Sequence, residues 1–406
     1  MSRKPLVVHI ISTLTRGGAE MMLCRLLSAM DDRFYRNAVI TLADMGDCGE
    51  KIRALGIPVY SLDMKRHGSS LAKAGSLLKI VTFIKLLNKL KPSILHTWMY
   101  HANIVGLAAM PFVGYPVLIW SLRTSGEALH TYPVTTRWVV KAGACFSRFI
   151  RKILVNSRRG ARVHASIGYC QKNMRYIPNG FDFDMFRPFP QARQRIRDEL
   201  GLPEDAILIG KIGSFSIRKD SRYFFEAVSC LDPDCGNVAF LLMGRGMSDK
   251  NSELMELVRS VSLSGRIHLL GERDDIERIM PALDFLVNSS VMEGMPNVVG
   301  EAMACAVPCV VTDVGDSAHM VGDTGRVVQA NNADALSMAI SNMIAMQQSD
   351  RERLGAKARV RMQEHFSMVR VAKEYEELYA ALFGQAKAEA SEGRVIKKHN
   401  GVYIND

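Results

Sequence analysis

Short apolar runs alternate with longer amphipathic stretches along most of the chain. Runs such as residues 6–13, 117–122 and 239–243 are rich in apolar residues and short, as buried parallel strands are. The stretches between them carry apolar residues at helical spacing and are bounded by turn residues. Regular alternation of strands and helices predicts a parallel sheet with helices on both of its faces.

Both halves of the chain follow this pattern. In the first half we expect strands at residues 6–13, 37–42, 59–62, 93–96, 117–122, 152–156 and 174–178, and helices at residues 19–30, 71–90, 102–109 and 136–149. In the second half we expect strands at residues 207–213, 239–243, 267–270, 284–288 and 309–312, and helices at residues 222–230, 251–260 and 297–305. The fold class is therefore α/β, with two Rossmann-like parallel-sheet domains that face each other across a cleft.

Turn residues mark the boundary between the two domains. Residues 178–188 contain two prolines among turn residues and are typical of a linker. We expect an N-terminal domain at residues 1–180 and a C-terminal domain at residues 181–365. A last helix at residues 366–383 carries an apolar stripe and is expected to pack back on the N-terminal domain, followed by a polar tail at residues 384–406.

Composition narrows the class of protein. With 406 residues, 48% hydrophobic and 23% charged, the sequence is typical of a globular protein of two or three domains. No apolar run approaches the length of a membrane span, and residues 6–11 are too short for the core of a signal peptide. We therefore expect a cytoplasmic protein. Its eight cysteines lack C-x2-C pairs and are read as free thiols.

Charge is distributed unevenly between the two halves. Residues 1–180 contain 26 Lys and Arg against 8 Asp and Glu, a net charge of +18, whereas residues 181–406 contain 26 against 33, a net charge of −7. The basic half suits a polyanion, such as anionic lipid headgroups, a lipid diphosphate or nucleic acid.

Two carboxylates eight positions apart form the strongest chemical motif, Glu293-Gly-Met-Pro-Asn-Val-Val-Gly-Glu301. Glu293 follows a predicted strand, so it lies in the crevice at the carboxyl end of a sheet, where α/β proteins bind ligands. Glu301 lies inside the next predicted helix, whose first amides can bind an anion. This arrangement suits a nucleotide sugar, because one carboxylate can bind sugar hydroxyls, the helix start can bind a phosphate and the second carboxylate can bind a ribose. The alternative to a ligand site is that the two glutamates are solvated and have this spacing by chance.

This segment resembles the E-x7-E signature of retaining glycosyltransferases of family 4, which have the GT-B fold. The resemblance extends from residue 6 to about residue 383. It implies that Glu293 binds the transferred sugar and that Glu301 binds ribose. It also implies that the backbone between them lines the sugar and phosphate; these residues are Gly294, Met295, Pro296, Asn297 and Val298.

Two further motifs fit the donor diphosphate. Gly17-Gly18-Ala19-Glu20 follows the first predicted strand and resembles the family's glycine loop, where backbone amides approach a phosphate. Lys219 matches the family's lysine, which neutralises the diphosphate, but Ser214 occupies the position of the family's arginine. Arg218 is a candidate substitute for that missing cation. A tight turn and a solvated loop lysine are the structural alternatives.

The remaining site residues rest on weaker matches. Gly271 and Arg273 resemble a loop that passes close to the nucleoside base, chiefly through its backbone. A common pattern near residue 96 is His-x-His, whereas this chain has His96-Thr-Trp98. His101 opens a predicted helix and is a candidate catalytic and acceptor-binding residue. Trp98 is a candidate surface on which an acceptor stacks.

The resemblance implies front-face transfer, in which the leaving phosphate accepts the acceptor's proton and the protein supplies position and charge. We expect no metal and no cofactor. The expected co-substrate is a nucleotide sugar, and a UDP sugar is the donor that we favour. Two stretches are basic and amphipathic, one around residues 73–91 and one around residues 137–152. They favour binding to an anionic membrane surface, which we expect to be the inner face of the plasma membrane. A lipid-linked saccharide is therefore the expected acceptor.

Three other functions remain alternatives. A nucleotide-sugar epimerase or hydrolase of the same fold would act without an acceptor. A nucleic-acid-binding protein would bind in a strongly salt-dependent way but leaves Glu293, Glu301 and Lys219 unexplained. A phosphorylase-like enzyme would need a lysine for pyridoxal phosphate, which we do not identify.

Overall fold

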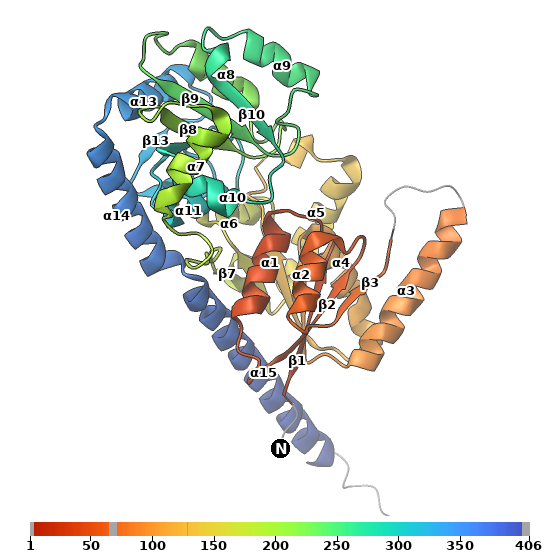
Figure 1. Cartoon of the computed structure of the whole chain (residues 1–406). Coiled ribbons are helices and arrows are strands. Elements are labelled where there is room, and N and C mark those ends of the chain that lie inside the picture. Colours follow the sequence, from red (N-terminus) through yellow and green to blue (C-terminus); the bar gives the residue numbers. More distant parts are fainter. Residues whose placement is uncertain (1–3, 65–70, 128, 400–406) are drawn as a thin grey trace, which may run out of the picture.

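The structure is a computed structural model that describes residues 4–64, 71–127 and 129–399, and it contains two parallel sheets, each with its own helices (Figure 1). The sheet of the N-terminal domain has the strand order β3-β2-β1-β4-β5-β6-β7. Its strands are β1 (Leu6–Ile11), β2 (Arg36–Thr41), β3 (Val59–Ser61), β4 (Ile94–Trp98), β5 (Val117–Leu122), β6 (Lys152–Val155) and β7 (Met174–Tyr176). Its helices are α1 (Gly18–Ala29), α2 (Gly46–Ala54), α3 (Leu71–Leu90), α4 (Tyr100–Ala109), α5 (Val134–Phe146) and α6 (Arg158–Ser166).

The sheet of the C-terminal domain has the strand order β10-β9-β8-β11-β12-β13. Its strands are β8 (Ile207–Ile212), β9 (Val238–Met243), β10 (Ile267–Gly271), β11 (Phe285–Asn288), β12 (Cys309–Thr312) and β13 (Arg326–Val328). The helices that follow the linker are α7 (Pro190–Leu200), α8 (Ser221–Ser229), α9 (Ser252–Arg259), α10 (Ile276–Ile279), α11 (Asn297–Ala304), α12 (Ser317–Val321), α13 (Ala333–Ala345), α14 (Gln348–Phe366) and α15 (Met368–His399). The predicted α/β class with two Rossmann-like domains is confirmed.

Both sheets are buried on both faces, which explains the continuous apolar runs in the sequence. On β1, Val7 and Ile11 belong to one hydrophobic core, and Val8 and Ile10 belong to the core on the opposite face. Because side chains alternate between the faces of a strand, every position of a doubly covered strand must be apolar. Strand β9 follows the same rule, with its alternate residues divided between the two cores of the C-terminal domain.

The strand order of each sheet reverses at one place, and that place fixes where ligands bind. The reversal lies between β1 and β4 in the first sheet and between β8 and β11 in the second. At such a switch point the loops after the two central strands diverge to opposite faces and leave a crevice at the carboxyl ends of the strands. The loops that follow β8 and β11 carry the residues predicted to bind the donor.

The chain passes between the two domains twice, at neighbouring points. Phe181 donates its amide to the carbonyl of Phe366 at 2.9 Å, and Met368 donates its amide to the carbonyl of Phe181 at 2.9 Å. Helix α14 lies on the C-terminal domain, and α15 continues past this crossing along the N-terminal domain beside α1 (Figure 1). Tyr375 and Tyr379 of α15 are completely buried in the core of that domain.

Some elements differ from the prediction. Strand β13 and helices α2, α6, α7, α10, α12, α13 and α14 were not predicted from the sequence. Several of these elements are short, and α2, α6 and α7 are polar on average. Helix α15 ends at His399 rather than near residue 383, so most of the predicted polar tail is helical. The last residues of that tail, 400–406, lie outside the described part of the chain. Among the described helices, none is both long enough and apolar enough to cross a bilayer.

Candidate active site

Lys219 and Glu293 meet at the switch point of the C-terminal sheet. Strands β8 and β11 pair in parallel, with Ile209 opposite Phe285, so the loops that follow them leave the sheet side by side. Lys219 lies in the loop after β8 and donates from Nζ to Oε1 of Glu293, which lies in the loop after β11. Their side chains are 26% and 12% exposed, so both are partly accessible to a ligand.

Further hydrogen bonds hold these two loops in position. The hydroxyl of Ser290 donates to Glu293 Oε1 at 2.8 Å, and the amide of Val291 donates to the carbonyl of Arg218 at 3.1 Å. The side chain of Arg218 is exposed, and Ser214 lies half-buried beside Ser216, with 3.3 Å between their hydroxyls. The two loops therefore form one connected unit that carries a cation and a carboxylate at its surface.

The first turns of two helices face each other across the domain boundary. Asn297, the first residue of α11, donates from Nδ2 to the carbonyl of Gly18, the first residue of α1, at 3.3 Å. A Cβ atom at Gly18 would lie 3.5 Å from that same amide nitrogen, so Gly18 and Asn297 are in direct contact. Helix N-termini carry partial positive charge and amide groups without helical partners, so two of them converging here favour an anion.

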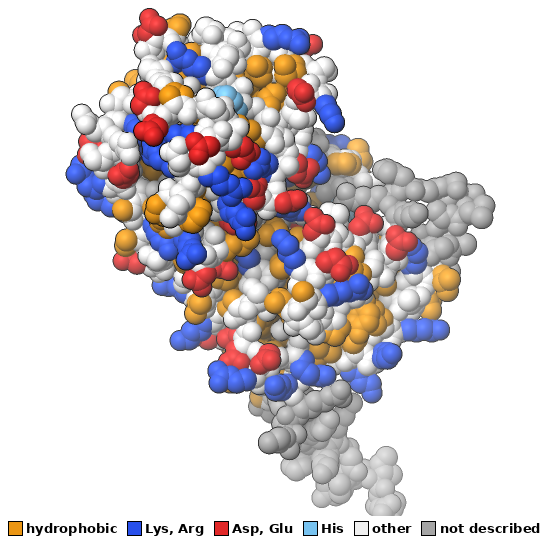
Figure 2. All heavy atoms as spheres, viewed as in Figure 1, with side chains coloured by type: hydrophobic (Ala, Val, Ile, Leu, Met, Phe, Trp, Pro, Cys, Tyr) orange, Lys and Arg blue, Asp and Glu red, His pale blue; other side chains and the backbone are white. Residues whose placement is uncertain are grey.

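The loop between Glu293 and α11 lies tightly against the N-terminal domain. A Cβ atom at Gly294 would lie 3.3 Å from Asn156 Oδ1 and 3.4 Å from the carbonyl of Arg123, so even an alanine here would be tightly packed against the N-terminal domain. Met295 is buried, and Pro296 is the N-cap of α11. Val298 is half-buried and packs against the hydrophobic core. Of the predicted residues Gly294 to Val298, Gly294 and Asn297 therefore contact the N-terminal domain directly. Lys, Arg, Asp and Glu side chains are visible around the domain boundary in Figure 2.

Glu301 contacts a residue that we did not select from the sequence. Arg25 of α1 donates from Nη2 to Oε1 of Glu301, and the two side chains are 8% and 14% exposed. The Arg25 guanidinium also lies over the rings of Phe181 and Phe186, at 5.8 and 5.5 Å from their centroids. The second carboxylate of the motif thus joins the two domains through a nearly buried ion pair. A charged residue inside the apolar stripe of α1 is the sequence signal that marks Arg25.

The burial of Trp98 contradicts its predicted role as a surface for the acceptor. Its indole is completely buried, donates from Nε1 to His9 Nδ1 at 3.3 Å, and lies parallel to the ring of Tyr375 of α15. The guanidinium of Arg123 covers it at 5.2 Å. Packing of α15 against β4, which the sequence periodicity does not specify, removes Trp98 from solvent.

The two histidines near this strand differ in environment. His96 is buried between the hydroxyls of Tyr379 and Ser121, at 2.7 and 2.8 Å, and burial lowers its pKa well below the ordinary value, so the ring is neutral. His101 lies in the first turn of α4 with its side chain exposed, at the carboxyl end of β4. Of the two, His101 is exposed to solvent and His96 is not.

The predicted nucleoside loop begins where β10 ends. Gly271 has φ of +63°, a left-handed conformation that glycine adopts without strain, and its carbonyl accepts the amide of Gly244 at 2.7 Å. The guanidinium of Arg273 binds Glu199 at 2.6 Å and Asp275 at 2.8 Å, and these hydrogen bonds raise its pKa. With the side chain bound in this way, the backbone of the loop is what remains available to a base.

Two buried polar residues, neither of them a predicted site residue, connect the domains at this site. Asn179 of the linker accepts hydrogen bonds from Arg123 Nη2 at 2.7 Å and Asn156 Nδ2 at 3.2 Å, and donates to Asn297 Oδ1 at 2.7 Å and to the carbonyl of Met295 at 3.3 Å. Its carboxamide therefore ties the N-terminal domain to the start of α11.

The second such residue, Asp316, lies after β12 and is 2% exposed. Its carboxylate accepts the hydroxyl of Ser157 at 2.8 Å and the amides of Arg158 and Arg159 at 3.0 and 3.2 Å. It binds the first turn of α6 in the other domain, where a negative charge is favourable.

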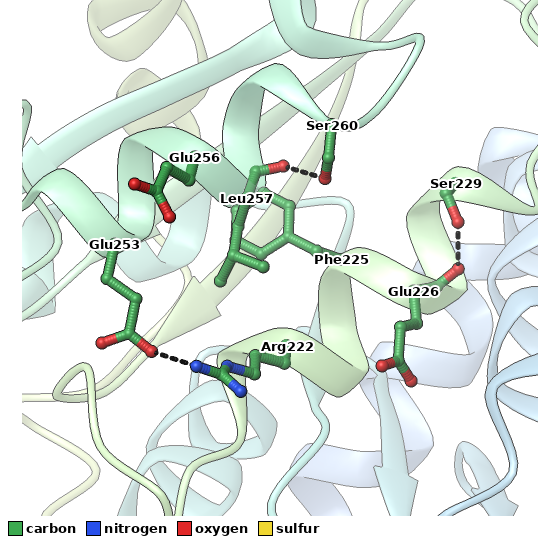
Figure 3. Close-up of a pocket in the computed structure, with 8 residues that line it drawn as sticks. All are labelled: Arg222, Phe225, Glu226, Ser229, Glu253, Glu256, Leu257 and Ser260. Carbon is green, nitrogen blue, oxygen red and sulfur yellow. Dashed lines mark hydrogen bonds and ion pairs between the residues drawn. The ribbon is translucent and has the colours of Figure 1, made fainter.

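A surface groove of about 450 Å³ lies elsewhere, between α8 and α9 (Figure 3). It is lined by residues of these two helices, and Arg222 Nη2 donates to Glu253 Oε1 at 2.7 Å within it. None of the residues of the donor loops lines it, so this groove is separate from the crevice. In the described part of the chain, no cluster of three or more His, Cys, Asp or Glu side chains is arranged to bind a metal ion.

Comparison with known proteins covers both domains. Residues 16–185 match the family model described as Glycosyltransferase Family 4, and residues 206–346 match the family model described as Glycosyl transferases group 1. The chain is 25% identical over 307 residues to UDP-Gal:alpha-D-GlcNAc-diphosphoundecaprenol alpha-1,3-galactosyltransferase of Escherichia coli, with 72% of this chain and 74% of that protein aligned. It is 21% identical to the capsular polysaccharide biosynthesis glycosyltransferase CapH of Staphylococcus aureus, with 73% and 78% aligned.

Solved structures share the arrangement of the two domains. The crystal structure of HepE from Anabaena in complex with UDP and glucose aligns with a TM-score of 0.79 and 22% sequence identity, covering 93% of this chain and 100% of that one. A similarity of this extent covers both domains, so the two-domain fold, and not one domain alone, is shared.

Proposed function

The chain belongs to the group 1, family 4 glycosyltransferases and has their GT-B fold, and from this we propose that it is a retaining hexosyltransferase acting on a nucleotide diphosphate sugar. In this proposal a hexose or N-acetylhexosamine is transferred to a lipid-linked or polysaccharide acceptor at the inner face of the plasma membrane. The observation that supports it most is the contact of Lys219 with Glu293 at the switch point, beside the first turns of α1 and α11.

Each group in this arrangement has a task in sugar transfer. Lys219 and the first amides of α11 would bind the diphosphate, and Glu293 would accept hydrogen bonds from hydroxyls of the transferred sugar. The bond between the anomeric carbon and the diphosphate oxygen breaks while the acceptor oxygen bonds to the same face of that carbon. The acceptor's proton passes to the departing diphosphate oxygen, so the products are a nucleoside diphosphate and a glycoside. The protein contributes position and positive charge.

The choice of donor and acceptor rests on the relatives. The E. coli relative is named for transfer of galactose from its UDP sugar to a diphosphoundecaprenol-linked sugar. A UDP sugar is therefore the donor that we propose, and a lipid-linked saccharide the acceptor. His101, exposed at the start of α4, is the residue that we place closest to the incoming acceptor.

An exposed surface of the N-terminal domain supports binding to an anionic membrane. Trp138 of α5 is 67% exposed and Phe149, in the turn after it, is 72% exposed. Lys141 lies 5.4 Å from the ring centroid of Trp138, and the guanidinium of Arg148 lies 5.8 Å from that of Phe149. Aromatic rings flanked by cations are suited to the interface between headgroups and acyl chains. The side chain of Lys73, in the predicted basic stretch at residues 73–91, lies outside the described residues.

The test begins with a panel of UDP, GDP and ADP sugars in a thermal-shift assay. The proposal predicts that one UDP sugar raises the melting temperature in a concentration-dependent way, because ligands of the folded state stabilise it. That donor is then incubated with membrane lipid extract, and the linkage of the product is determined by NMR. An α-linked product from an α-linked donor supports retention. Inversion contradicts the mechanism, and release of free sugar or an epimerised donor without an acceptor favours the epimerase or hydrolase alternative.

A further inference from the structure

A buried lysine lies directly beneath the Lys219–Glu293 contact. Lys211 is on β8, and its side chain is 4% exposed. Its ammonium donates to Ser289 Oγ at 2.7 Å and to the carbonyl of Lys219 at 3.2 Å, and lies 5.0 Å from the ring centroid of Phe224 on α8. Ser289 and Lys219 lie in the segments that follow β11 and β8, and Phe224 lies on the helix that follows the loop after β8.

This position is unfavourable for a lysine that has only a packing role. Burying an ammonium group without a carboxylate partner costs several kcal/mol, as an order of magnitude. Among the described residues no carboxylate lies within ion-pair distance of Lys211. Its hydrogen-bond acceptors are a neutral hydroxyl and a neutral carbonyl. A hydrophobic side chain would fill the same space at lower cost, so the ammonium itself is expected to have a function.

The charged groups that face Lys211 come from two loops. Lys219 and Asp220 precede α8, and Glu293 follows β11. Together these groups and burial lower the pKa of Lys211 to about 7, and burial is the largest cause. The charge of Lys219 also contributes to the lowered pKa, whereas Asp220 and Glu293 act in the opposite direction. The group is thus balanced between its charged and neutral forms near neutral pH, and an added anion decides which form is present.

We propose that Lys211 is a positioning residue of the donor site and supplies its second positive charge, in the place of the arginine position occupied by Ser214. Through the carbonyl of Lys219 it fixes the end of the loop that presents the Lys219 ammonium. Through its own charge it attracts the donor diphosphate across the thin layer of this loop. This inference rests on the proposed function and names the group that completes the diphosphate site.

Arg218 is the competing candidate for that charge. Its side chain is exposed on the loop, and its carbonyl accepts the amide of Val291. An exposed arginine is largely screened by solvent, whereas a buried ammonium acts through a lower dielectric. If Arg218 supplied the charge, replacing Lys211 would leave the affinity for the diphosphate unchanged.

A bound diphosphate favours the charged form of Lys211 and therefore raises its pKa. At pH 8 a lysine with a pKa of about 7 is protonated in roughly one molecule in ten, so binding that charges it takes up close to one proton. The uptake falls towards zero at pH 6, where Lys211 is already protonated. Proton uptake that appears with this pH dependence is a signature that a merely structural role does not produce.

Isothermal titration calorimetry with UDP measures this uptake, by comparing buffers of different ionisation enthalpy at pH 6 and pH 8. We expect uptake by the wild type at pH 8. Lys211→Met is expected to bind UDP at least tenfold more weakly and to lose the uptake. Lys211→Arg, which is charged at both pH values, is expected to bind more tightly than Lys211→Met and also to lose the uptake. Lys250→Met, an exposed lysine in another loop, is the matched control and should behave as the wild type.

The outcomes separate this inference from the proposed function. Proton uptake and UDP affinity that are unchanged in Lys211→Met would overturn the inference while leaving the glycosyltransferase proposal intact. Absence of binding by the wild type to UDP, GDP and ADP would contradict the proposed function itself. If Lys211→Met does not fold, Lys211→Arg decides the question, because uptake that persists with an arginine at this position excludes Lys211 as its source. Circular dichroism of each variant establishes folding.

Discussion

Removing one partner of the Arg25–Glu301 pair should weaken the association of the two domains measurably. In Arg25→Met the methionine retains much of the packing against Phe181 and Phe186, but Glu301 loses its cationic partner. Breaking a buried ion pair by removing one partner costs about 3–5 kcal/mol. Because the two side chains are 8% and 14% exposed, we expect a loss near the lower end, about 3 kcal/mol.

A double-mutant cycle isolates the pairwise contribution. Glu301→Gln leaves Arg25 without a counter-ion, and we expect it to cost about 2 kcal/mol. Arg25→Met/Glu301→Gln removes both charges, so its loss should be clearly smaller than the sum of the two single losses, with a coupling of roughly 2–3 kcal/mol. Urea unfolding followed by circular dichroism at pH 7 measures all four proteins. The exposed pair of Arg33 with Asp31 is the control, and its coupling should stay below about 1 kcal/mol.

A coupling below about 0.5 kcal/mol for Arg25 and Glu301 would refute this reasoning, because it would mean that water replaces either partner without loss. The same variants address the ribose role proposed for Glu301. If Glu301 binds the ribose in addition to its ion pair with Arg25, Glu301→Gln should raise the KM for the donor more than Arg25→Met does.

Three further predictions follow from the contacts described above. Asp316→Ala removes the carboxylate that binds the first turn of α6 and should lower the free energy of unfolding in urea by about 2–4 kcal/mol. Asp313 has an exposed side chain three residues earlier, and Asp313→Ala should change that free energy by less than about 0.5 kcal/mol. The pKa of Lys211 is lowered in the folded protein, so its burial opposes folding fully below pH about 7 and progressively less between pH about 7 and 10.5. The stability that Lys211→Met gains relative to the wild type should therefore fall as the pH rises through that range. A stability difference in urea unfolding that stays constant with pH would contradict this prediction. Replacement of Trp138 and Phe149 by alanine should reduce sedimentation with vesicles containing phosphatidylglycerol at least fivefold, and equal binding of the wild type to neutral vesicles would exclude the anionic surface as its partner.

The sequence predicted the fold and the centre of the site because both depend on local patterns. Apolar runs on doubly covered strands are continuous, so β1 and β9 were recognisable without tertiary information. Lys219 and Glu293 each follow such a strand. Since β8 and β11 are neighbours in the sheet, their loops meet, as the resemblance to family 4 implied.

Contacts between distant segments account for what the sequence did not predict. Trp98 was expected at the surface, but α15 returns from the far end of the chain and covers it. Asn179 and Asp316 bind groups of the opposite domain, and an isolated Asn or Asp in a loop carries no signal of such a partner. Lys211 stands out only because a cation interrupts a buried strand, a feature that gains meaning once Ser289 and the Lys219 carbonyl are seen around it.

The turnover of purified Glu293→Ala tests the central claim most directly. It is measured with the donor that the sugar-nucleotide panel identifies. The matched control is Glu256→Gln, which replaces an exposed glutamate on α9. Loss of the hydrogen bonds from Glu293 to the transferred sugar should lower kcat/KM at least a hundredfold, about 2.7 kcal/mol of transition-state stabilisation, while the circular dichroism spectrum stays that of the wild type. Glu256→Gln should retain full activity. Turnover of a folded Glu293→Ala equal to that of the wild type would contradict the assignment of this crevice as the site of sugar transfer.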